Sequence, residues 1–202
     1  MIITRMEVLG KSKVNIYLDD EYSFFLSPKE VHQLDITEGE EVPASFYDSV
    51  IEKIILPKAK FKALSLLKLT DRTETELRNK LSDAGYTQNI VDQAVQYVAG
   101  YGYLNDERLA SAYVRTRKNA KSKLVIKMDL LQKGVDAKTI ELAFLEEYNT
   151  DDQEDPELVA IRKVITKKVR SLEDMDFDAK QKLIASLYRK GFDISKIKQV
   201  IG

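Results

Sequence analysis

The chain has 202 residues with 32 lysines and arginines, 33 aspartates and glutamates, and a formal net charge of −1 at pH 7, so it is not a polycation adapted to bind nucleic acid along its whole length. It contains no cysteine, which excludes a disulfide framework, thiolate catalysis and a cysteine-ligated zinc site. Hydrophobic residues make up 44% of the chain, but no run approaches the roughly 18 apolar residues of a membrane-spanning helix, so we expect a cytoplasmic protein without a membrane partner.

Residues 1–56 predict a small N-terminal region that contains a β-hairpin. Apolar and polar residues alternate along residues 14–18, and a second apolar-rich run covers residues 22–26, which is typical of two half-buried strands. Residues 19–21 lie between them and supply a turn, although they lack the Asn-Gly or Asp-Gly pair that most strongly favours a tight hairpin. We therefore expect one β-hairpin in an otherwise mainly helical protein.

Three more features follow the hairpin in this region. Residues 27–30, Ser-Pro-Lys-Glu, predict a helix start, with serine as the N-cap, proline in the first turn and glutamate closing a capping box. A second extended segment is expected at residues 39–42. From Phe46 onwards the apolar spacing becomes helical, and we expect Pro57 to interrupt that helix.

The rest of the chain repeats one short phrase three times, about every 50 residues. In each copy a leucine lies four residues before a glycine, and an apolar residue follows the glycine directly. This phrase is typical of a helix that ends at a left-handed glycine and is followed by a hydrophobic contact and a second helix. The copies are Leu81-Gly85-Tyr86, Leu130-Gly134-Val135 and Leu187-Gly191-Phe192. We expect three three-helix repeats, at residues 57–104, 105–150 and 151–202.

Repeat 1 has clear signals for all three of its helices. Phe61, Leu64 and Leu67 predict the buried stripe of a first helix that ends near Leu69. A capping box at Thr73–Glu76 starts the second helix, and the apolar residues between positions 90 and 98 mark the third.

Repeats 2 and 3 have helix starts at polar capping residues. These are Asn105 or Asp106, Ser122, Asp136, Asp155 followed by Pro156, Asp178 and Asp193. The acidic stretch at residues 146–157 separates the two repeats and is expected to be a solvated hinge. The expected fold is therefore mainly α, an elongated tandem array of three three-helix repeats with a small N-terminal region that contains the β-hairpin.

The stretch from Leu77 to Phe144 carries an ordered set of motifs. They are Leu-x3-Leu-x3-Gly-Tyr at 77–86, Gly-Tyr-Leu-Asn-Asp at 102–106, Ala110, Tyr113, Val114, Arg117, and Leu-x2-Lys-Gly-Val at 130–135. Together they resemble the RecX family, the regulatory proteins of the RecA recombinase, closely over repeats 1 and 2 and more loosely over repeat 3. Where the family commonly has a glycine and an acidic pair, this chain has Ala120-Lys121-Ser122 and Asn105-Asp106. Serine and asparagine are both good N-caps, so these positions indicate helix starts.

The resemblance implies a function in binding. RecX-like proteins bind in the groove of the RecA–DNA filament and modulate, mostly by inhibition, ATP hydrolysis, strand exchange and co-protease activity. The implied partners are the RecA filament and, in addition, single- or double-stranded DNA. We accordingly expect a monomer that is not an enzyme and that needs no cofactor. A Gly-x4-Gly-Lys-Ser phosphate loop is absent from the sequence, so we do not expect the chain to hydrolyse ATP itself.

Basic residues concentrate in two stretches that are candidates for contact with RecA or DNA. The first contains Arg115, Arg117, Lys118, Lys121, Lys123, Lys127 and Lys133, with Asp129 as the only acid among them. The second contains Arg162, Lys163, Lys167 and Lys168, together with Arg170. Such a concentration of positive charge suits phosphates or an acidic groove. The alternative is an ordinary solvated helix face, on which the aliphatic stems of the basic side chains cover apolar neighbours.

Tyrosines and the single histidine carry weaker signals. Tyr86, Tyr97, Tyr101, Tyr103 and Tyr113 are candidates for stacking on bases, but their positions at helix ends and along helix stripes favour packing instead. His32 has no positioned partner in the sequence, so we do not assign it a catalytic role. The competing function is a stand-alone helical DNA-binding protein that uses the basic stretch, and it predicts tight, salt-dependent binding to naked DNA.

Overall fold

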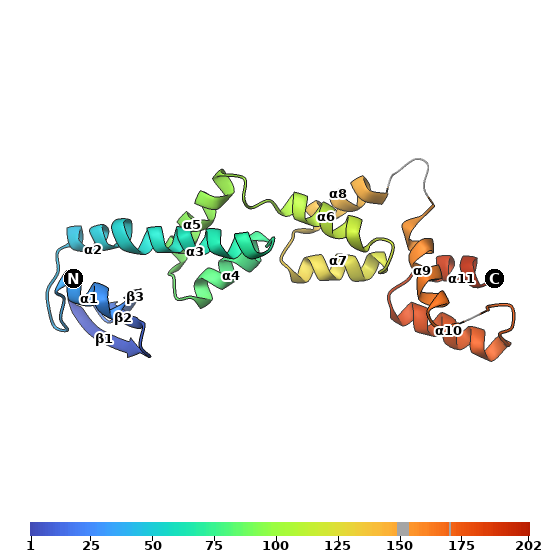
Figure 1. Cartoon of the computed structure of the whole chain (residues 1–202), viewed down its shortest axis with the longest axis horizontal. Coiled ribbons are helices and arrows are strands. Elements are labelled where there is room, and N and C mark those ends of the chain that lie inside the picture. The colour runs from blue at the N-terminus through green and yellow to red at the C-terminus, as the bar shows by residue number, and fades with distance from the viewer. Residues whose placement is uncertain (149–153, 170) are drawn as a thin grey trace. The chain divides into compact units, whose positions relative to one another are not determined.

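The computed structural model describes residues 1–148, 154–169 and 171–202, and these residues form two compact units, Met1–Leu104 and Asn105–Gly202. Figure 1 labels the elements. The first unit contains β1 (Ile3–Leu9), β2 (Lys13–Leu18), β3 (Glu21–Leu26), α1 (Pro28–Leu34), α2 (Ala44–Val50), a π-helix (Ile51–Ile55), α3 (Leu56–Leu69), α4 (Glu74–Asp83) and α5 (Gln88–Gly100). The second contains α6 (Asp106–Arg117), α7 (Lys123–Gln132), α8 (Ala137–Tyr148), α9 (Pro156–Thr166), α10 (Phe177–Arg189) and α11 (Ile194–Ile201). The expected fold class is confirmed: mainly helical, with three three-helix repeats and a small antiparallel sheet.

The N-terminal sheet has three strands in the order β1-β2-β3. The predicted hairpin is β2–β3, and its two-residue turn places Asp19 and Asp20 at φ of 49° and 69°, as a type I′ turn requires. The sequence did not predict β1, because only Ile3 in this edge strand is fully buried and its polarity does not alternate cleanly. The extended segment at residues 39–42 pairs with the start of β1, where the Ile3 amide donates to the Glu40 carbonyl at 2.9 Å.

The helix that begins at Ala44 runs without a break to Leu69, so the predicted interruption at Pro57 is wrong. A proline inside an α-helix lacks one amide donor and its ring clashes with the carbonyl one turn earlier. Here a π-turn precedes Pro57, and the Leu56 amide donates to the Ile51 carbonyl five residues back. This widened turn accommodates the ring. The expected stripe on α3 is also partly wrong, because Phe61 is exposed and Ala59 and Ala63 are buried instead.

The N-terminal sheet and repeat 1 share a single hydrophobic core. The Tyr22 hydroxyl donates to the Gly85 carbonyl at 2.5 Å, and the Lys13 ammonium donates to the neighbouring Ala84 carbonyl at 3.2 Å. The rings of Phe25 and Tyr86 lie 5.1 Å apart. Burial, with smaller effects from neighbouring tyrosines, raises the pKa of Tyr22 to about 12. The sheet therefore packs on the turn between α4 and α5.

In the second unit, repeats 2 and 3 each close on a core of their own. Gly134 and Gly191 have φ of 84° and 80°, and Gly85 in the first unit has φ of 99°, which confirms that the repeated phrase ends helices at left-handed glycines. The N-cap of α10 is Asp176, so the predicted cap at Asp178 is wrong by two residues. The other predicted capping residues lie at the helix starts, and their side chains accept hydrogen bonds from first-turn amides at Asn105, Ser122, Asp136, Asp155 and Asp193.

The structure describes only part of the acidic stretch at residues 146–157. Residues 149–153 of the expected hinge lie outside the described residues, as does Arg170 of the second basic stretch. Its two ends are structured, since Glu147 lies in the last turn of α8 and Glu157 in the first turn of α9. Both of these glutamates are buried, so neither belongs to a solvated segment.

Candidate functional site

The basic stretch of repeat 2 lies on α6, on the loop that follows it and on α7, and the fold places carboxylates from α7 and α8 beside it. The Arg115 guanidinium lies 2.6 Å from Glu147. Lys127 lies 2.5 Å from Glu141 on α8. In the folded protein, carboxylates from other parts of the chain therefore offset much of the positive charge of this basic stretch.

Lys118 is buried, with 9% of its surface exposed. Its ammonium donates to the backbone carbonyl of Glu147 and lies 3.7 Å from the carboxylate of the same residue. Since α6 and α8 pack against each other in repeat 2, this contact joins their C-terminal ends. Lys118 therefore serves the interior of repeat 2 and presents little charge to a partner.

Lys121, Asp129 and Tyr113 form a local cluster on the outside of repeat 2. The Asp129 carboxylate accepts from the Lys121 ammonium at 2.6 Å and from the Tyr113 hydroxyl at 2.8 Å. These hydrogen bonds hold the pKa of Asp129 below its ordinary value, and the bond to Asp129 raises the pKa of Lys121. Tyr113 is half-buried and has the packing role that its position in the sequence predicts.

Arg117 and Lys123 are exposed and make no ion pair with any carboxylate of the described residues. The Arg117 guanidinium lies 5.5 Å from the ring centre of Tyr113, and the Lys123 ammonium lies 4.9 Å from that of Phe144. Lys133 is half-buried at the end of α7. Arg117 and Lys123 are consequently the cations of the first stretch that are best placed to meet a partner.

The second basic stretch lies on α9 and just after it. Arg162 pairs with Glu154, and the Lys168 ammonium donates to the Ser186 hydroxyl at 2.6 Å. Lys163 and Lys167 are exposed. The structure thus places the two basic stretches on different repeats of the second unit.

The sequence analysis missed a set of exposed apolar side chains on α7 and α8 of repeat 2, which we call the α7–α8 apolar surface. Their exposed fractions range from 45% to 60%. They are Leu124, Met128 and Leu131 on α7, and Leu142 and Leu145 on α8. The missed signal was the composition of α7, Lys-Leu-Val-Ile-Lys-Met-Asp-Leu-Leu-Gln, in which Ile126 and Leu130 fill the core and the remaining apolar residues have no place there. Leu124, Met128 and Leu131 share one face of α7 by their spacing, and an exposed apolar helix face is typical of a protein-binding surface.

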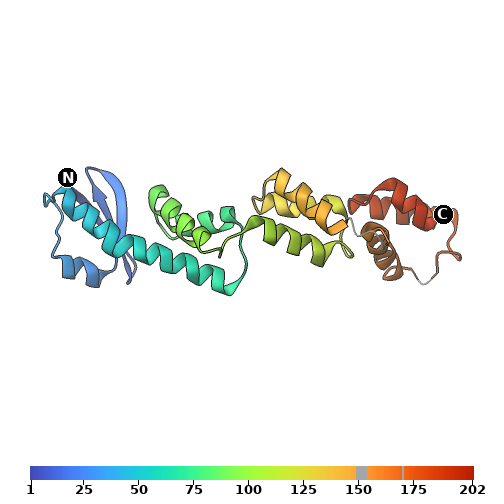
Figure 2. The same ribbon diagram turned by 90° about the horizontal axis from the view of Figure 1, so that it is seen from above.

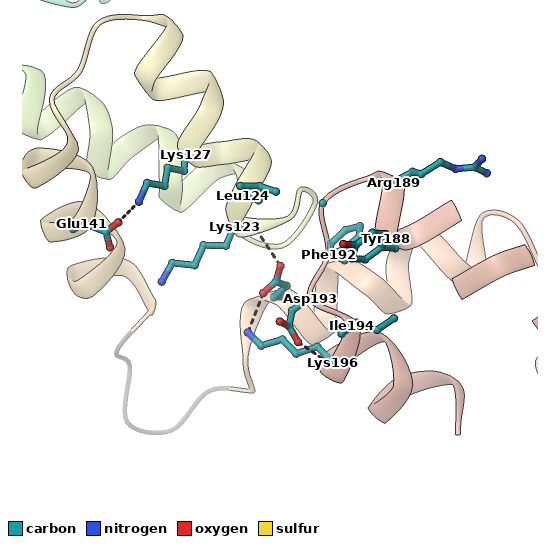
Figure 3. A pocket seen from close by; sticks show the side chains of 12 residues that line it. Lys123, Leu124, Lys127, Glu141, Tyr188, Arg189, Phe192, Asp193, Ile194 and Lys196 are labelled. Atoms are coloured by element: carbon teal, nitrogen blue, oxygen red, sulfur yellow. Dashed lines mark hydrogen bonds and ion pairs between the residues drawn. The ribbon is translucent and has the colours of Figure 1, made fainter. Parts of the chain in front are cut away.

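A pocket of about 770 Å³ lies between repeats 2 and 3 within the second unit. Figure 3 shows Lys123 and Leu124 on α7 and Tyr188, Phe192 and Ile194 on repeat 3 around this pocket. Its lining combines apolar side chains with cations and with the carboxylates of Glu141, Glu157 and Asp193.

Polar contacts also join the two repeats. The buried carboxylate of Glu157 accepts from the backbone amide of Lys123 at 3.3 Å and from the Lys196 ammonium at 2.9 Å. The Ser122 hydroxyl donates to the Lys190 carbonyl at 2.8 Å. Burial opposes the charge of Lys196, but its hydrogen bonds to Asp155 and Glu157 raise its pKa. Polar contacts therefore hold the start of α7 to repeat 3.

The described residues were also compared with the requirements of a metal-ion site and of a membrane-spanning helix. The described part of the chain has no cluster of three or more histidines, cysteines or carboxylates suited to a metal ion. Of the helices described, none is both long and apolar enough to cross a bilayer.

Comparison with known proteins gives consistent matches. The family models for the first, second and third three-helix domains of RecX match residues 59–97, 105–143 and 155–201. The regulatory protein RecX of Clostridium acetobutylicum is 30% identical over 204 residues, covering 98% of this chain and 94% of that protein. That of Caldanaerobacter subterraneus subsp. tengcongensis is 30% identical over 203 residues, covering 100% and 98%.

Solved structures support the fold. A crystal structure of a regulatory protein RecX matches with a TM-score of 0.65 at 24% identity, covering 98% of each chain. The crystal structure of RecX from Lactobacillus salivarius matches with a TM-score of 0.60 at 27% identity, covering 72% of this chain and 94% of that one.

Proposed function

Because this chain belongs to the RecX family, we propose that it regulates the RecA recombinase by binding in the groove of the RecA–DNA filament and lowering ATP hydrolysis, strand exchange and co-protease activity. The observation that carries the proposal is the order of the three domain matches, each of which falls on one helical repeat. Repeats joined in tandem offer separate contact surfaces to successive subunits of a polymer. We further propose that the protein acts in the cytoplasm as a monomer and catalyses no reaction.

The apolar surface on α7 and α8 is the contact with RecA that we favour. Protein interfaces gain most of their energy from a few buried apolar or aromatic anchors surrounded by a polar rim. Met128 and Leu145 are exposed apolar candidates for such anchors, and Arg117 and Lys123 are the cations suited to a rim. The second basic stretch on α9, with Lys163 and Lys167, supplies a further candidate contact.

The pairing of cations in repeat 2 makes the competing function, a stand-alone DNA-binding protein that uses the basic stretch, less favourable. Salt-dependent affinity for DNA grows with the number of phosphates that cations neutralise. Lys118 is buried, and Lys121 and Lys127 already have carboxylate partners. Few cations of this stretch therefore remain for phosphates.

Substitution on the apolar surface tests the proposal. We expect Met128→Asp and Leu145→Asp to weaken inhibition of the RecA ATPase by about tenfold or more, as loss of an interface anchor does. Phe177→Asp is the matched control, because Phe177 is exposed on α10, away from this surface. Equal inhibition by all of these variants, with unchanged helicity by circular dichroism, would exclude the α7–α8 surface as the contact.

A further inference from the structure

Three tyrosines form a cluster at the C-terminal end of α5. The ring centres of Tyr97 and Tyr101 lie 4.9 Å apart, and those of Tyr101 and Tyr103 lie 6.4 Å apart with an angle of 26° between the ring planes. Tyr101 and Tyr103 are 66% and 57% exposed, so the expectation that they are partly buried packing residues is wrong. Their rings present flat aromatic surface to the solvent.

The backbone fixes this arrangement. Gly102 has φ of 71°, and its amide donates to the Ala99 carbonyl at 2.9 Å. The amide of Tyr103 reaches back to the Val98 carbonyl at 3.1 Å, which closes the helix end and folds Tyr103 beside Tyr101. The backbone therefore places the two exposed tyrosines beside each other before any ligand arrives, which lowers the ordering cost of binding.

Helix α3 brings positive charge to one side of the cluster. The Lys60 ammonium is 4.6 Å from the ring centre of Tyr97, on the side where α3 packs across α5 (Figure 1). Helix α3 carries four lysines and no acidic residue, and within the described residues only Lys58 among them forms an ion pair, with Glu30. The single acid of α5, Asp92, lies near the other end of that helix and pairs with Arg78.

We propose that Tyr101 and Tyr103 form a base-stacking platform for single-stranded DNA, with Lys60 placed for the adjoining phosphate. Unstacked bases bind exposed aromatic faces regardless of their sequence, and a nearby cation follows the backbone. In a duplex the bases are stacked on one another, so no base face is available to stack on the tyrosines. The site lies wholly in the first unit, and the proposal does not require that the protein act on RecA.

Binding to a labelled oligo-dT of about 16 nucleotides tests the platform. We expect Tyr101→Ala and Tyr103→Ala each to weaken binding by roughly 5- to 150-fold, the loss associated with one stacked base. Tyr101→Phe keeps the ring and is expected to bind as the unchanged protein does. Tyr188→Ala, which removes a tyrosine 63% exposed in the second unit, is the matched control. The chain has ten tyrosines and no tryptophan, so the part of the DNA-induced quenching of tyrosine emission that the two alanine variants lose reports the same contact.

An abasic oligonucleotide of equal length separates bases from phosphates. The two alanine variants should bind it as the unchanged protein does, whereas Lys60→Gln should lower the salt dependence of binding to either strand by about 0.7 on a log–log scale. Equal losses on the abasic and normal strands, or an equal loss on a duplex, would refute stacking. Unchanged DNA binding together with weaker inhibition of RecA would overturn the proposal and assign the rings to a protein contact.

Discussion

Lys118→Met is expected to destabilise repeat 2 without touching any partner surface. The methionine side chain keeps the length of the buried lysine stem and removes only its charge and its three donors. The Glu147 carbonyl then loses the ammonium that it accepts from, while the Glu147 carboxylate keeps Arg115 at 2.6 Å. The sequence alone made Lys118 a contact residue, so this variant distinguishes the two roles.

The magnitude follows from these contacts. A hydrogen bond from a charged donor is worth about 1.5 to 3 kcal/mol, and little apolar burial is lost, so we expect a loss of about 2 kcal/mol in the free energy of unfolding. For a chain of this size that corresponds to a fall of about 4 to 8 °C in the melting temperature. Lys118→Ala also removes buried methylenes at about 0.8 kcal/mol each and should be less stable still.

Urea unfolding followed by circular dichroism measures the effect, with Arg117→Met as the control. Because Arg117 is exposed, its variant should stay within about 0.5 kcal/mol of the unchanged protein. If Lys118→Met kept full stability but lost binding to RecA filaments, the internal role that we assign to Lys118 would be refuted.

Three further predictions concern stability. Gly191→Ala should destabilise the protein more than Gly102→Ala. Both glycines have positive φ, which costs an alanine about 1 to 2 kcal/mol, but only at Gly191 does the new methyl group meet a neighbour, the Ser122 hydroxyl at 2.9 Å. Equal melting temperatures of the two variants would contradict this. Ser122→Ala loses both a helix cap and the bond to the Lys190 carbonyl, so calorimetry should show a loss of about 2 kcal/mol, and a loss under 0.5 kcal/mol would count against this contact between the repeats. The pKa of Asp129 is lowered in the folded state, so its stabilising contribution is complete above the ordinary value of 3.8 and is lost as the pH falls through the folded value. Asp129→Asn should flatten the loss of stability in urea titrations below about pH 4, and an unchanged slope would contradict the assigned shift.

The elements that the sequence predicted depend on local hydrogen bonds. Ser27 with Glu30, and Thr73 with Glu76, form the predicted capping boxes within one helical turn. The helix-ending glycines, such as Gly85, could be predicted equally well, because a position with left-handed backbone conformation favours glycine wherever it occurs. Helix starts and ends in this fold are consequently encoded over a few neighbouring residues.

The features that the sequence did not predict depend on residues far apart in the chain. The partner of Lys118 is Glu147, which lies 29 residues away on α8. The residues next to Lys118 in the sequence do not include this partner, so the sequence analysis treated the charge of Lys118 as available to RecA or DNA. Tyr101 is 66% exposed, and its place at a helix end does not reveal from the sequence whether other elements of the fold cover its ring. Pro57 is tolerated because the ladder of hydrogen bonds widens just before it, an adjustment that periodicity does not reveal.

Inhibition of RecA is the central claim, and one titration tests it directly. The purified protein is added to RecA on single-stranded DNA while ATP hydrolysis is followed, and binding to the same DNA without RecA is measured in the same buffer. We predict that ATP hydrolysis falls at protein concentrations too low to coat naked DNA. Unchanged ATP hydrolysis despite tight binding to naked DNA would contradict regulation of the filament and make this a DNA-binding protein.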